Sequence, residues 1–172
     1  RVTMSEKDQI QEVLSKTDAE FSPTFCFAKW YHANIYFQTG ETHSCYHPRP
    51  HQIDSNEIKG NPSALHNTTF KKLERKEMLE GKRPAGCSYC WKLEDQGDLS
   101  DRHYRSGEEW VGTDGWNEVL EGSWDENINP RYVEVNFNQA CNFKCSYCSP
   151  HLSTAWQEEI DEFGEYPTTA PH

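Results

Sequence analysis

Three closely spaced cysteines towards the end of the chain have the type and spacing of a metal-binding loop. Cys141, Cys145 and Cys148 form a C-x3-C-x2-C run directly after residues 132–138, which alternate in polarity as a strand does. Three thiolates on one loop can ligate three irons of a cubane iron–sulfur cluster, whereas ferredoxin-type clusters take four cysteines. The spacing therefore leaves one iron open, and an open coordination position is typical of a catalytic metal centre.

The other four cysteines make up a second complete set of metal ligands. Cys87 and Cys90 form a C-x2-C pair, and Cys26 and Cys45 flank a predicted β-hairpin that brings them towards the same end of a small sheet. Thiolates bind both zinc and iron–sulfur clusters, so four cysteines suit a structural zinc site as well as a cluster. Spacing alone does not choose between the two.

Simpler explanations compete with the three-cysteine cluster. A structural zinc site would need a fourth ligand, for example His151, and the three thiols could also be ordinary buried side chains. The seven cysteines are an odd number, and residues 1–20 are polar and lack the apolar core of a secretory signal. We therefore expect a cytoplasmic protein whose reduced thiols are metal ligands, not disulfides.

The composition indicates a small acidic protein. A chain of 172 residues corresponds to about one domain, and only 34% of it is hydrophobic, so metal ligation is expected to supply part of the stability. The net charge of −11 opposes binding to a phosphate backbone, so nucleic acid is not an expected partner. No apolar stretch approaches the length of a membrane span.

The polarity pattern predicts short elements around the cysteines. We expect a helix over residues 6–16, started by a capping box at Ser5 and Asp8, and a hairpin of strands 30–38 and 42–46. Residues 47–62 are expected to be loop. Further helices are predicted over 67–78, just after Cys90, around 116–120 and over 156–163, and a strand is predicted up to residue 138.

These motifs resemble the radical SAM superfamily. The C-x3-C-x2-C run after a strand is similar to its cluster loop, and Phe25 to Trp30, the hairpin with Cys45, and Cys87 to Cys90 resemble its twitch domain, a short relative of the SPASM domain. One departure is Cys45-Tyr46, where many relatives have adjacent cysteines.

The resemblance implies a fold and a set of cofactors. The fold would be a small α+β metal-bound domain, made of a β-hairpin and helices, followed by the first βα unit of a truncated radical SAM (β/α) partial barrel. Its parts would be an N-terminal helix (1–20), a twitch-like domain (21–96), a connector (97–130) and the start of the core (131–172). The cofactors would be a [4Fe–4S] cluster on Cys141, Cys145 and Cys148, an auxiliary [4Fe–4S] cluster on the other four cysteines, and S-adenosylmethionine, with Tyr147 against its adenine.

The implied activity is reductive cleavage of S-adenosylmethionine to a 5′-deoxyadenosyl radical that abstracts hydrogen from a substrate. The electron would come from a reductant protein such as flavodoxin or ferredoxin, and the substrate, a peptide or a small molecule, is unknown. We expect the chain to be the N-terminal portion of such an enzyme and to be inactive alone. The alternatives are a non-catalytic interaction module stabilised by zinc and a simple electron-transfer protein.

Overall fold

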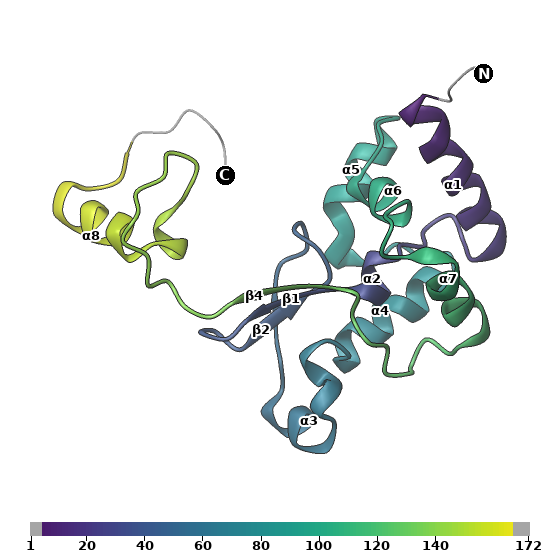
Figure 1. The fold of residues 1–172 in the computed structure, drawn as a ribbon, viewed down its shortest axis with the longest axis horizontal. Coiled ribbons are helices and arrows are strands. Elements are labelled where there is room, and N and C mark those ends of the chain that lie inside the picture. Colours follow the sequence, from purple (N-terminus) through teal and green to yellow (C-terminus); the bar gives the residue numbers. More distant parts are fainter. Residues whose placement is uncertain (1–4, 167–172) are drawn as a thin grey trace.

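The computed structural model describes residues 5–166, which form a mixed α/β fold built on one small sheet (Figure 1). Helices α1 to α7 lie together on one side, and α8 lies apart from them beyond the end of β4 (Figure 1). The bounds are α1 Glu6–Glu20, α2 Ala28–Tyr31, β1 His32–Tyr36, β2 Glu41–His43, β3 His51–Gln52, α3 Ser55–Gly60, η1 Pro62–Leu65, α4 Thr69–Leu79, η2 Ala85–Cys87, α5 Ser88–Asp95, α6 Asp101–Ser106, α7 Gly112–Glu121, β4 Tyr132–Asn136, η3 Pro150–Leu152 and α8 Thr154–Phe163.

The sheet has four strands in the order β3-β2-β1-β4. The predicted hairpin is confirmed: β1 and β2 pair antiparallel, and Gly40 in their turn has a φ of +70°, a conformation that glycine adopts without steric penalty. Strand β4 pairs in parallel with β1, with His32 opposite Tyr132. The strand that precedes the three-cysteine loop therefore belongs to the same sheet as the hairpin.

The two faces of the sheet differ in polarity because side chains alternate along each strand. His32 and Asn34 of β1 lie in register with Tyr132 and Glu134 of β4, which gives one polar face. The residues between them, including Val133 and Val135, point to the other face. β4 is the last strand on its side of the sheet, as expected for a strand with an unpaired edge.

An aromatic cluster forms the centre of the core. The rings of Phe25 and Phe27 meet edge to face with centroids 4.8 Å apart, and Phe27 also contacts Trp116 of α7. Trp30 and Tyr31 are almost completely buried in the same cluster. The run of aromatic residues on either side of Cys26 thus fixes that cysteine and α2 in the interior.

Several predicted elements are confirmed, and others are wrong. The capping box at Ser5 and Asp8 starts α1, which runs four residues further than predicted, to Glu20, and Thr68 caps α4. Trp30 and Tyr31 end α2 and do not begin the strand. The predicted loop over 47–62 contains β3 and α3, because Asp54 caps a six-residue helix without apolar periodicity. Residues 97–130, expected as a connector, contain α6 and α7 and contribute Val111, Trp116, Val119 and Ile128 to the core.

Within residues 5–166, no helix is long and apolar enough to cross a membrane.

Candidate metal centre

The structure brings Cys26, Cys45, Cys87 and Cys90 together around one enclosed cavity of about 20 Å³. Three separate segments supply them: the turn before α2, the residues after β2, and η2 with the start of α5. The β1–β2 hairpin reverses the direction of the chain, and this brings Cys45, after β2, back towards Cys26, before α2. The two cysteines of the C-x2-C pair lie three residues apart at a helix start, where side chains share a face.

Polar groups near three of these sulfur atoms favour the thiolate form. The backbone of His47 acts in this way on Cys45, the backbone of Arg102 on Cys90, and the ammonium group of Lys29 on Cys87. Groups of this kind stabilise thiolates and tune a bound metal, so they are the expected surroundings of cysteine ligands.

Two buried cations line the same cavity, and each is paired with a carboxylate. Lys29 Nζ lies 2.5 Å from Glu74 Oε2, and both side chains are buried. Arg102 Nη2 lies 2.9 Å from Glu94 Oε2, and Arg102 Nη1 donates to the carbonyl oxygen of Phe25. Two positive charges therefore line the cavity, and the carboxylates of Glu74 and Glu94 hold them in position.

Burial raises the pKa of all four thiols, and their mutual repulsion raises the pKa of Cys26 further. The pKa of Cys45 rises to about 12, mainly through burial, although the His47 N–H and the Lys29 ammonium oppose that rise. Without a metal these side chains stay protonated at neutral pH. A metal that binds here must displace their protons, which couples metal affinity to pH.

The residues present fit a tetrathiolate centre in their chemistry. Four thiols and two flanking cations are components of such a site. In the part of the chain that the structure describes, no group of three or more His, Cys, Asp or Glu side chains is already arranged to hold a metal ion. The four cysteines are thus neighbours around a cavity and not a formed coordination sphere.

The three-cysteine loop is held by the start of α8. Ser153 Oγ donates to the carbonyl oxygen of Phe143, at 2.7 Å, and Trp156 Nε1 donates to that of Cys145, at 3.0 Å. Cys141, Cys145 and Cys148 are half-buried. Helix α8 therefore fixes the backbone of the loop while its thiols remain accessible.

Tyr147 lies on the outside of this loop and is 90% exposed. A hydrogen bond with Cys145 raises the pKa of its hydroxyl. Tyr147 is thus not packed in the core. The structure shows it beside one of the three thiols, with its ring open to solvent.

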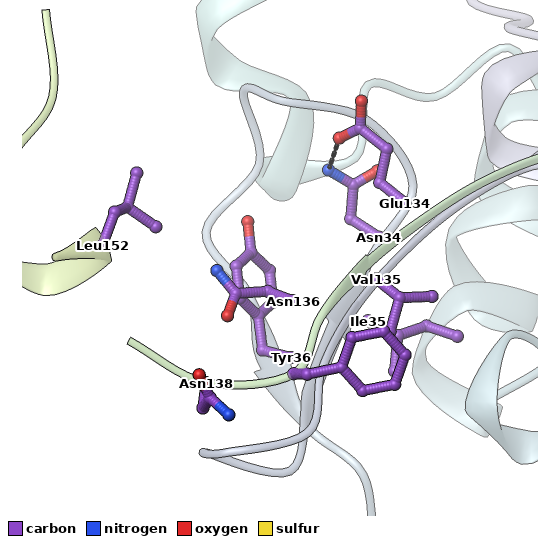
Figure 2. A pocket seen from close by; sticks show the side chains of 9 residues that line it. Asn34, Ile35, Tyr36, Glu134, Val135, Asn136, Asn138 and Leu152 are labelled. Atoms are coloured by element: carbon purple, nitrogen blue, oxygen red, sulfur yellow. Dashed lines mark hydrogen bonds between the residues drawn. The ribbon is translucent and has the colours of Figure 1, made fainter. Parts of the chain in front are cut away.

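An open cleft of about 660 Å³, with both polar and apolar lining residues, lies along the ends of β1 and β4 and is bounded by Leu152 of η3. Figure 2 shows Asn34 and Glu134 pointing towards one another on this face, joined by a hydrogen bond of 3.0 Å. The other polar lining residues are Tyr36, Asn136 and Asn138. Sequence reasoning missed this cleft, although its polar residues recur at every second position of the two strands, the period of one sheet face.

No protein-family model, curated protein or solved structure matches this chain. The functional interpretation therefore rests on the chain's own side chains and their arrangement.

Proposed function

We propose that the chain belongs to a radical SAM enzyme with an auxiliary metal centre. The observation that carries this proposal is the convergence of Cys26, Cys45, Cys87 and Cys90, from three separate segments, on one enclosed cavity. A disordered or adventitious set of cysteines would have no reason to meet there. The second supporting observation is the C-x3-C-x2-C loop, which follows β4 of the same sheet.

The two cysteine sets have different surroundings, and we assign them different roles. The four buried cysteines would hold the auxiliary group and stabilise the core around α2 and α5. The half-buried Cys141, Cys145 and Cys148 would hold the cluster whose chemistry, when bound, is reductive cleavage of S-adenosylmethionine. The exposed ring of Tyr147 is accessible to stack on the adenine of that cofactor.

The open cleft along β1 and β4 is our candidate for substrate binding. Asn34, Tyr36 and Glu134 offer hydrogen-bond donors and acceptors there, which suits a polar substrate such as a peptide. We place the protein in a reducing, cytoplasmic environment with a flavodoxin-like or ferredoxin-like electron donor, because both proposed sites need free thiols.

Metal analysis of two proteins tests the proposal. The intact chain, reconstituted anaerobically with iron and sulfide, should bind about eight irons, four for each cubane cluster. The variant with Cys141, Cys145 and Cys148 all replaced by Ala should retain about four irons and the same circular dichroism spectrum, because the loop lies outside the core. Unchanged iron content in the triple variant would contradict the assignment of the loop.

A zinc-stabilised interaction module is the second candidate, and one observation favours it. The cavity between the four cysteines holds roughly one water-sized group, which is closer to a single ion than to a cubane. Protein purified with one tightly bound zinc, no sulfide and no visible absorbance would support this candidate. Iron and sulfide in equal amounts at the four-cysteine site would exclude it.

A further inference from the structure

Lys29 is the cation most closely tied to the four-cysteine cavity. It follows Cys26 by three residues, lines the cavity, and is only 2% exposed. Its ammonium group lies 2.5 Å from the Oε2 atom of Glu74, and its side chain lines the same cavity as Cys87. Lysine is among the residues least often found fully buried, so this placement calls for a specific cause.

The carboxylate of Glu74 is itself held in a fitted position. A Cβ atom added to Gly86 would overlap Glu74 Oε1, so the absence of a side chain next to Cys87 admits this carboxylate. The contact ties α2, α4 and η2 together behind one ligand. Glu74 therefore holds Lys29 against the cavity, and the lysine cannot turn away to solvent.

A buried ion pair of this kind contributes little net stability, because desolvation of both charges offsets their attraction. The ion pair has a function when a metal bound by four thiolates makes the cavity negatively charged. Four thiolates around a dicationic centre carry a net charge of about −2, whether the centre is zinc or an oxidised [4Fe–4S] cluster. A fixed ammonium group in the wall of the cavity lowers the energy of that anion.

We propose that Lys29 is a positioning residue for the four-cysteine centre, where its buried ammonium group at the cavity wall offsets the negative charge of the bound tetrathiolate. Glu74 holds the lysine in place. This inference rests on the proposed metal centre, but it is independent of which metal occupies it.

The test compares zinc affinities in the full chain that lacks Cys141, Cys145 and Cys148, so that only the four-cysteine site is measured. Zn²⁺ is titrated in competition with a chromophoric chelator. Lys29→Met combined with Glu74→Gln removes both charges at nearly constant volume and avoids an orphaned carboxylate. We expect this double variant to bind Zn²⁺ about 10- to 100-fold more weakly, as losses of groups around a metal ligand do.

Glu74→Gln alone is the matched control, because the glutamine Oε1 can still accept the hydrogen bond of Lys29 and so keeps the cation at the cavity. We expect its zinc affinity to equal or exceed that of the parent. After reconstitution with iron and sulfide, the double variant should also have a lower reduction potential, since loss of a cation disfavours the added electron. Thermal unfolding of each zinc-loaded protein shows that the variants are folded.

Equal zinc affinity, within about threefold, in a folded double variant would overturn the role of Lys29 while leaving the metal centre intact. A loss in Glu74→Gln as large as in the double variant would also overturn it, because the cation is still present there. Failure of the parent itself to bind Zn²⁺ or an iron–sulfur cluster would overturn the metal centre, and the inference with it.

Discussion

His32→Phe should make the protein more resistant to acid. His32 is completely buried, and its ring lies between Tyr46 and Tyr132, with centroids 5.3 and 4.4 Å away. Neither ring nitrogen has a hydrogen-bond partner among the residues described. Phenylalanine keeps the ring and removes the group that titrates.

Burial lowers the pKa of His32 to about 4. Arg105 and Lys71 lower it as well, while Asn34 and Glu134 oppose the shift. In the unfolded chain the pKa of histidine is about 6.5, so the unfolded state binds more protons between pH 6.5 and 4. Stability is therefore complete above pH 6.5 and falls as the pH falls towards 4. The slope is about 1.4 kcal/mol for each pH unit, which amounts to about 2 kcal/mol at pH 5.

The measurement is thermal unfolding of parent and variant at pH 7.5 and pH 5. For a chain of this size, 2 kcal/mol corresponds to about 4–8 °C. Between pH 7.5 and pH 5, the melting temperature of the variant should therefore fall by about 4–8 °C less than that of the parent. Any packing change caused by the larger ring is the same at both pH values and cancels in the comparison. Equal losses in the two proteins would show that His32 is not the neutral buried base described above.

Three further substitutions test contacts in the core by urea unfolding. Gly86→Ala should destabilise the protein by about 1–3 kcal/mol, because the new Cβ overlaps Glu74, and no loss would mean that the carboxylate is free to move. Arg102→Met should cost about 1.5–3 kcal/mol, since it removes the charged hydrogen bonds to Glu94 and leaves that carboxylate with Ser100 and His103, and a loss below about 1 kcal/mol would refute this. Tyr31→Phe removes a hydroxyl that donates to the carbonyl of Gly115 at 2.7 Å and should cost about 1–2 kcal/mol; an unchanged free energy of unfolding would show that water replaces this bond.

Local sequence signals predicted the elements that depend on neighbouring residues. The capping residues Ser5 and Thr68 mark the starts of α1 and α4, and alternation marks β4, because these features are encoded within a few positions. The meeting of Cys26 with Cys45 followed from the hairpin. The type and spacing of the cysteines are conspicuous in the sequence, and their role as metal ligands stays a prediction.

The partners of these residues depend on distant contacts and were not predictable. Glu74 and Glu94 lie in polar helices and look like solvated charges, yet each forms a buried pair with a cation at the cavity. The period of a strand predicts which residues share a face, but it does not predict the neighbouring strand. The parallel pairing of β4 with β1 is a contact of this kind.

That pairing gives the chain an order of assembly. The hydrogen bond between Asn34 and Glu134 joins residues 100 positions apart, whereas the four cysteines around the cavity all precede residue 91. Synthesis proceeds at about 5–20 residues per second, so the edge of β1 stays unpaired for roughly 5–20 seconds until β4 has been made. The four-cysteine site can close during this interval, while an unprotected strand edge is exposed to other chains. β4 then covers that edge and brings the three-cysteine loop to a scaffold that has already formed.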